Sequence, residues 1–111
     1  IPSLSDSAKE TLVRALAESL TNIAHHAQAQ NVEVNLRMKD KGISLTIQDD
    51  GQGFDPNAIP AGHYGILGIK ERVRLVNGTF EIQSEINKGT TLKITIPFLA
   101  ERSASEVEVP L

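Results

Sequence analysis

Four short segments of the chain alternate apolar and polar residues, and this period of two is typical of strands that bury one face. They are residues 32–38, 43–47, 80–82 and 92–98. The first two segments are joined by the turn sequence Asp40–Gly42, which predicts an antiparallel hairpin. Asn87–Gly89 is a similar turn before the last segment. Pro97 is expected at the end or edge of that strand, because it has no N–H group to donate.

Two other stretches repeat apolar residues every three or four positions, which is the period of a helix. The first begins after an N-cap at Ser5 or Asp6, and Asn31 is expected to end the helix or its connecting turn. Its apolar stripe, expected to face the core, consists of Leu12, Leu16, Leu20, Ile23 and Ala27. The second runs through residues 66–76 and is closed by Asn77–Gly78. The order α-β-β-loop-α-β-β predicts an α/β fold in which helices cover one face of a sheet.

The composition bounds the size and the class of the protein. With 111 residues the chain has room for one domain, which we expect at residues 1–100, followed by a C-terminal tail at residues 101–111. It has no cysteine, which excludes disulfides and thiolate zinc sites. Its net charge of −3 and its few aromatic residues argue against a nucleic-acid partner. No apolar stretch approaches the ~20 residues of a membrane span, so no direct membrane contact is expected of this fragment.

A group of polar residues lies on one side of the first helix. Glu18, Asn22, His25 and His26 follow helical spacing, so they project from one face, away from the apolar stripe. One interpretation is a solvated helix face. The other is a magnesium or catalytic site, because asparagine is a poor helix former and both Glu and Asn offer hard oxygen ligands. Zinc is not favoured, since the HEXXH order is missing.

Three further motifs leave structural and functional interpretations open. Asp49–Phe54 places a carboxylate before two glycines, which fits either an acidic turn or a close approach of the backbone to a ligand. It lacks the spacing of a calcium loop. In residues 62–72 a glycine-rich stretch runs directly into a helix, which fits either a phosphate site or a hinge. The stretch matches neither a Rossmann nor a Walker A motif. Residues 88–91 alone indicate only a hairpin turn.

The four motifs in this order resemble the GHKL family of ATP-binding domains. The resemblance rests on Glu18–Ala27, Asp49–Phe54, His63–Val73 and Gly89–Thr91, and it spans about residues 12–98. The chain is most similar to the catalytic domains of NarX/DesK-like sensor histidine kinases. The resemblance implies a Bergerat fold, which is a two-layer α/β sandwich with a mixed, mostly antiparallel sheet. It also implies a helix and a strand before the first motif, so an N-terminally trimmed domain is expected.

The resemblance also implies roles for individual residues. Asn22 would ligate the Mg²⁺ that bridges the nucleotide phosphates, and Glu18 would help to orient the metal or the transferred phosphoryl group. Asp49 would accept a hydrogen bond from the adenine amino group. Gly51 and Gly53 would let the chain pass close to the base.

Further residues implied in nucleotide binding belong to the base site, the phosphate site and an ATP lid. Thr90 would join a water network near the base, and Gly65 and Gly68 would be hinges of a lid at residues 55–64. The others are His25, His26, Ile66, Leu67 and Lys70. His25 stands where the family usually has lysine, which would make it a weaker and pH-dependent partner for phosphate.

The implied activity needs a second domain. The chain would bind Mg·ATP and pass the γ-phosphoryl group to a histidine on a dimerisation and phosphoacceptor domain, for relay to a response regulator of the NarL/LuxR type. None of its own histidines, His25, His26 and His63, lies in the family's phosphoacceptor sequence. The fragment is expected to be monomeric and cytoplasmic, in a dimeric parent kinase anchored in the bacterial inner membrane. Two alternatives stay open: an anti-sigma factor or serine kinase of the same fold, and a catalytically weak nucleotide-binding regulatory module.

Overall fold

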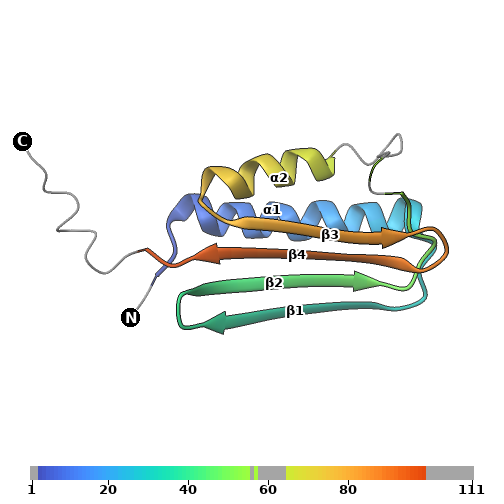
Figure 1. Cartoon of the computed structure of the whole chain (residues 1–111), viewed down its shortest axis with the longest axis horizontal. Helices are drawn as coiled ribbons and strands as arrows, with labels where there is room; N and C mark the ends of the chain where they lie inside the picture. Colours follow the sequence, from blue (N-terminus) through green and yellow to red (C-terminus); the bar gives the residue numbers. More distant parts are fainter. Residues whose placement is uncertain (1–2, 56, 58–64, 100–111) are drawn as a thin grey trace, which may run out of the picture.

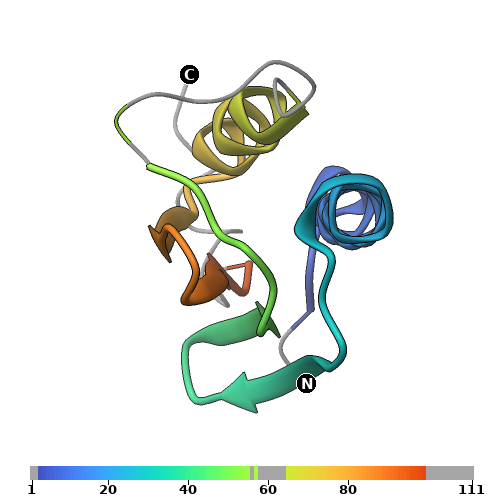
Figure 2. The same ribbon diagram turned by 90° about the vertical axis from the view of Figure 1, so that its right-hand side faces the viewer.

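A sheet of four strands forms one layer of the molecule, and two helices lie side by side on one of its faces (Figure 1, Figure 2). The computed structural model describes residues 3–55, 57 and 65–99. In chain order the elements are α1 (Asp6–Asn22), the π-helical turn η1 (Ile23–Ala27), β1 (Val32–Lys39), β2 (Gly42–Asp49), α2 (Gly65–Leu75), β3 (Thr79–Glu85) and β4 (Gly89–Pro97). The predicted order of elements and the two-layer α/β sandwich are confirmed.

The sheet has the strand order β1-β2-β4-β3, and every strand pairing among the described residues is antiparallel. The predicted hairpin is the β1–β2 pair, in which Lys39 faces Gly42 across the turn. β3 and β4 form a second hairpin, whose turn contains Asn87 (φ 68°) and Gly89 (φ 85°) in the left-handed region. β4 ends at Pro97, as predicted. The resemblance implies a mixed sheet, which needs at least one parallel pair of strands. The described residues contain no parallel pair.

Local chemistry fixes the start of α1 and the end of α2. The Ser5 hydroxyl is the N-cap of α1 and accepts a hydrogen bond from the Ala8 amide at 3.0 Å. α2 closes with Asn77 in the left-handed conformation, and the Gly78 amide donates to the Val73 carbonyl at 2.9 Å. The predicted N-cap and C-cap are both confirmed.

The core lies between the two helices and the inner face of β2 and β4. Its buried apolar residues are Ala8, Ala15, Ile43, Leu45, Ile47, Ile69, Val73, Leu92, Ile94 and Ile96. The stripe predicted on the first helix is only partly right: Leu12 and Leu16 pack against the core, but Leu20 is exposed. The residues that α1 buries most are Ala8, Thr11, Ala15, Ser19 and Asn22. These small side chains are buried because α1 packs closely against α2.

β1 is an edge strand with an exposed apolar face, so the prediction of a half-buried strand is wrong here. Its exposed apolar residues are Val32, Val34, Leu36 and Met38. Leu36 pairs with the buried Leu45 of β2, so the two side chains share the core-facing side of the sheet. The alternation is real, but the helices do not extend over this edge strand.

Some sequence predictions concern residues outside the described part of the chain. These are the tail at residues 101–111, most of the lid at residues 55–64, and the side chain of Ala27. No helix in the described part is long and apolar enough to span a membrane.

Candidate functional site

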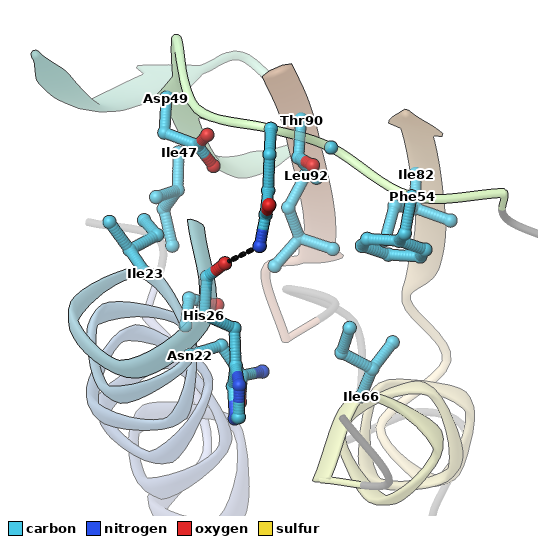
Figure 3. Close-up of a pocket in the computed structure, with 13 residues that line it drawn as sticks. Asn22, Ile23, His26, Ile47, Asp49, Phe54, Ile66, Ile82, Thr90 and Leu92 are labelled. Atoms are coloured by element: carbon cyan, nitrogen blue, oxygen red, sulfur yellow. Dashed lines mark hydrogen bonds between the residues drawn. The ribbon is translucent and has the colours of Figure 1, made fainter. Parts of the chain in front are cut away.

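A cavity of about 220 Å³ opens between the end of α1, the start of α2 and the adjacent ends of β2 and β4 (Figure 3). It is lined by Ser19, Asn22, Ile23, His26, Ile47, Asp49, Gln52, Gly53, Phe54, Ile66, Ile82, Thr90 and Leu92. Most of its wall is apolar. The volume is below the about 300–1,000 Å³ typical of sites that enclose a whole drug-sized ligand. The described walls therefore suit one flat ring of a ligand rather than all of it.

Asp49 is the acidic residue that lines the cavity, at the last position of β2. Its side chain is buried, and its Oδ1 accepts a hydrogen bond from the Gly51 amide at 2.8 Å. Burial raises the pKa of the Asp49 carboxyl; the Gly51 bond opposes this rise, and the charge of Asp50 adds to it. Thr90 is the register partner of Asp49 on β4, so the two side chains share one face. The carboxylate thus offers a ligand an acceptor that is shielded from water.

The loop after β2 is fixed to the β3–β4 hairpin. The Phe54 amide donates to Ser84 Oγ at 2.8 Å, and Ser84 Oγ lies 2.7 Å from Thr90 Oγ1. Gly53 (φ 60°) approaches Glu85 so closely that a Cβ would overlap the Glu85 carbonyl oxygen. Only glycine combines this backbone conformation with this approach. The second glycine of the motif is therefore needed to hold the loop along the cavity.

Asp50 fastens the same loop to the segment that precedes β1. Its Oδ1 accepts hydrogen bonds from the Gln30 and Asn31 amides, each at 2.9 Å. Its Oδ2 accepts from Asn31 Nδ2 at 2.9 Å. These bonds, with the Asn31 side chain the largest contributor, lower the pKa of the Asp50 carboxyl. The loop is thus held from both sides, by the hairpin and by the segment before β1.

Gln52 connects the loop to η1 across the cavity. Its side-chain amide donates a hydrogen bond to the His26 carbonyl oxygen, drawn as the dashed line in Figure 3. The backbone carbonyl oxygen of Gln52 accepts a hydrogen bond from the Asn87 amide at 2.6 Å. One residue therefore links the helical side of the cavity to the β3–β4 turn.

The helical side of the cavity is built by the last turn of α1 and by η1. Asn22, which is 9% exposed, lies where the α-helix passes into the π-helical turn, a feature often found at functional sites. The prediction that the polar face of the first helix points away from the core is wrong for Asn22. This residue lies among the buried residues of α1. His26 lines the cavity, whereas His25 is exposed and does not.

Glu18 and the first residue of α2 are in contact. A Cβ at Gly65 would overlap the Glu18 carboxylate. Asn22 lies one turn further along α1, and together the two side chains offer the hard oxygen ligands that Mg²⁺ prefers. The described residues contain no cluster of three or more His, Cys, Asp or Glu that could hold a metal. Glu18 and Asn22 alone would not complete the coordination shell of a magnesium ion.

The structure brings some of the predicted site residues together and leaves others apart. Those that line the cavity are Asn22, His26, Asp49, Gly53, Ile66 and Thr90. Gly51 is buried beside Asp49 and donates to it. Leu67, Gly68 and Lys70 are exposed on α2 and do not line the cavity. Gly65 is the first residue of α2 and Gly68 lies in its first turn, so the hinge role of both stays a prediction.

Several residues of the site were not predicted as functional. The sequence pattern assigns Ile23, Ile47, Ile82 and Leu92 only to the core or to strands, yet they form apolar walls of the cavity. Two serines carry a signal that could have been used. Helical spacing places Ser19 on the face of Asn22, and strand alternation places Ser84 on the face of Ile82.

Comparison with known proteins agrees with this architecture. Residues 7–100 match the histidine kinase-, DNA gyrase B-, and HSP90-like ATPase family. The chain is 44% identical over 89 residues to the sensor histidine kinase YdfH of Bacillus subtilis, a match that covers 78% of this chain and 22% of that protein. It is 31% identical over 97 residues to the nitrate/nitrite sensor protein NarX of Escherichia coli, covering 87% and 16%. The solved structure of the mycobacterial sensor histidine kinase MprB shares the fold, with a TM-score of 0.63 at 23% identity over 80% of this chain and 71% of that one.

The family match includes nearly the whole described part of the chain, and with it the helix end, the loop after β2 and the β3–β4 hairpin that enclose the cavity. The chain itself spans only about a fifth of the length of the curated relatives that it matches. It belongs to the histidine kinase-, DNA gyrase B-, and HSP90-like ATPase family.

Proposed function

We propose that this chain is the catalytic ATP-binding domain of a two-component sensor histidine kinase of the NarX/DesK-like kind. In this role it binds Mg·ATP and presents the γ-phosphoryl group to a histidine on a separate dimerisation and phosphoacceptor domain. Membership of the family supports the nucleotide, and the names of the relatives, which are sensor histidine kinases, support the reaction.

The observation that carries the proposal is the buried Asp49 carboxylate at an apolar cavity. Adenine is a flat ring whose exocyclic amino group donates hydrogen bonds, and this donor would meet Asp49. Guanine has a carbonyl oxygen at the same ring position, which the carboxylate would repel. Apolar side chains such as Ile47, Ile66 and Leu92 would cover the ring, and burial of apolar surface would add affinity.

The phosphates would extend from the base toward the end of α1 and the start of α2. The first amides of α2 have no partners within the helix, and they attract anions. Asn22 and Glu18 would hold Mg²⁺ through their oxygen atoms, and the bound ion would neutralise phosphate charge. In phosphoryl transfer, positioning and charge neutralisation supply most of the catalysis. The residues of this chain would therefore act by binding and orienting the nucleotide.

In this proposal the phosphoryl acceptor belongs to another domain. His25 and His26 lie in η1 beside the nucleotide site, and His63 lies outside the described residues. The receiving histidine would belong to the dimerisation domain of the same kinase, and a response regulator of the NarL/LuxR type would take the phosphoryl group next. The domain would be monomeric and cytoplasmic, within a dimeric kinase anchored in the inner membrane.

A nucleotide-binding regulatory module without catalysis is the second candidate, and His25 favours it. His25 stands where the resemblance leads one to expect lysine, and it is exposed and does not line the cavity. A lysine ammonium carries a permanent charge and three N–H donors, so histidine would be the weaker partner for phosphate. The two candidates differ in phosphoryl transfer and agree in ATP binding.

Calorimetric titration with Mg·ATP tests the nucleotide site, with Asp49→Asn as the matched variant. Asparagine keeps an oxygen for the Gly51 amide, so the loop should stay folded, but it loses the charge. We expect the wild-type chain to prefer ATP over GTP. We expect Asp49→Asn to weaken ATP binding about 10- to 150-fold, the effect of losing a hydrogen bond to a charged group worth about 1.5–3 kcal/mol. Equal ATP affinities of the two proteins would remove the adenine assignment.

Phosphoryl transfer is tested by mixing the chain with radiolabelled Mg·ATP and the dimerisation domain of a NarX-like kinase. We expect label on the dimerisation domain and none on the chain alone. The label should be acid-labile, because phosphohistidine hydrolyses in acid. Acid-stable label on a protein substrate would indicate a serine kinase of the same fold, and ATP binding without transfer would favour the regulatory module.

A further inference from the structure

Ser19 is a buried hydroxyl of the cavity without a hydrogen-bond partner in the described part of the chain. It lies in α1, is 7% exposed and lines the cavity. Serine and threonine inside a helix often donate to a carbonyl one turn earlier, and Thr21 does so, to the Ala17 oxygen at 2.9 Å. Ser19 makes no such bond. Because native proteins leave few buried polar groups unpaired, we expect this hydroxyl to meet a bound molecule.

Packing alone does not require a hydroxyl at this position. Ala8 and Ala15 occupy the same buried line of α1, at earlier turns of the helix. An alanine at position 19 would fill nearly the same space without placing an unpaired oxygen in the interior. The neighbouring walls at Ile23 and Ile66 are apolar and offer no polar atom of their side chains. The Ser19 hydroxyl therefore adds a polar group beside the apolar walls at Ile23 and Ile66, one turn before Asn22.

Polar groups on the sheet side of the cavity already have partners. The Asp49 carboxylate accepts from the Gly51 amide at 2.8 Å. The Thr90 hydroxyl lies 2.7 Å from Ser84 Oγ. Unlike these groups, the Ser19 hydroxyl can form a hydrogen bond with a ligand without breaking a bond within the described chain.

We infer that Ser19 is a ligand-binding residue whose hydroxyl donates a hydrogen bond to a ring nitrogen of bound adenine, directly or through one ordered water. This inference rests on the proposed function. The direction of the bond follows from the chemistry of the base, since its ring nitrogens are acceptors and its amino group is assigned to Asp49. Asp49 lies on the strand side of the cavity and Asn22, one turn after Ser19, on the helix side (Figure 3). A purine ring between the two sides would form hydrogen bonds at both. The pocket would therefore recognise a ring nitrogen of the base as well as its amino group.

Ser19→Ala tests the inference because it removes only the hydroxyl. If the hydroxyl serves the ligand, its loss should stabilise the free protein and weaken ATP binding, a combination that a purely structural role would not produce. We expect a higher Tm without nucleotide and an ATP Kd raised about 2- to 10-fold, the size of one net hydrogen bond. Ser44→Ala is the matched control, because Ser44 is buried in β2 and does not line the cavity. Its ATP Kd should equal that of the wild type.

Deaza analogues of ATP, in which one ring nitrogen is replaced by carbon, identify the acceptor while keeping the amino group. We expect one analogue to bind the wild type more weakly than ATP and to lose no further affinity on Ser19→Ala, as in a double-mutant cycle. An unchanged ATP Kd for Ser19→Ala, or the same loss with ATP and every analogue, overturns the inference. A wild-type chain that binds no ATP refutes the proposed function and the inference together. Normal wild-type binding with a silent Ser19→Ala refutes the inference alone.

Discussion

Two neighbouring aspartates show how strongly the surroundings of a residue decide its chemistry. Asp49 is buried at the cavity, and this burial raises the pKa of its carboxyl. Asp50 is exposed but receives hydrogen bonds from Asn31 and Gln30, which lower the pKa of its carboxyl. The first side chain is available to a ligand, and the second holds the loop that positions the first.

Asp50→Ala is expected to lower thermal stability in a pH-dependent way. A carboxyl whose pKa is lower in the folded than in the unfolded state stabilises the fold at pH values above its unfolded pKa, and this contribution is lost as the pH falls through the folded pKa. The substitution should therefore reduce Tm at neutral pH and have progressively less effect below about pH 4. Circular dichroism during heating at several pH values measures this effect. Asp40→Ala, in the exposed β1–β2 turn, is the control, and an equal Tm loss for Asp50→Ala at every pH would contradict the prediction.

The sequence reveals residues in motifs more readily than it reveals their tertiary partners. Asp49 and Asn22 could be selected because they stand in motifs whose order resembles a known family. The bonds between Asp50 and Asn31 could not be predicted, since the two residues are 19 positions apart and no periodic pattern records such a contact. Ser19 was missed for another reason. A serine in a helix is ordinary, and although helical spacing places it on the face of Asn22, its burial without a partner among the described residues is visible only in the structure.

At the scale of elements, the two glycines of α2 have different surroundings. Gly65 begins the helix against the Glu18 carboxylate, whereas a Cβ at Gly68 would meet open space. The resemblance predicts that both are hinges of a lid, and both lie in the first turn of the 11-residue helix α2. A glycine inside a helix with no steric need for it lowers the stability of that helix.

Gly68→Ala is expected to stabilise the protein by about 1 kcal/mol, because alanine has the higher helix propensity. For a domain of this size the Tm should rise by about 4–8 °C. Gly65→Ala is the matched comparison: its Cβ would overlap the Glu18 carboxylate, so its Tm should fall relative to Gly68→Ala. Thermal unfolding of the two variants and the wild type measures both effects. A lower Tm for Gly68→Ala would show that this position needs a non-helical backbone, as a hinge would.

The types of the elements could be predicted from periodicity, but their ends and faces only in part. Each of the four alternating segments became a strand, because a period of two matches the pleat of a sheet. The end of α1 could not be predicted, since an apolar period of three to four residues continues through Ile23 into η1. The leucine stripe also gave the wrong face at Leu20. Close contact between α1 and α2 favours the small residues beside the stripe instead.

At the scale of the whole molecule, the helices cover the sheet unevenly. One row of register partners crosses the four strands: Leu36, Leu45, Ile94 and Phe80. The exposed fraction falls along this row from 59% at Leu36 to 3% at Leu45 and 0% at Ile94. β1 lies at the edge of the sheet away from α2 (Figure 1, Figure 2). Alternation in the sequence identifies the apolar face of a strand, but it does not show which strands of the sheet the helices cover.

Alanine substitutions at the two ends of this gradient should differ strongly in stability. Ile94→Ala removes a fully buried side chain and leaves a cavity, so the free energy of unfolding should fall by about 2–5 kcal/mol. Leu36→Ala shortens an exposed side chain and should change it by no more than about 0.5 kcal/mol. Urea unfolding measures both values, and Leu36→Ala should keep its ATP affinity because Leu36 does not line the cavity. A loss at Leu36 as large as that at Ile94 would mean that another surface covers the apolar face of β1 in solution.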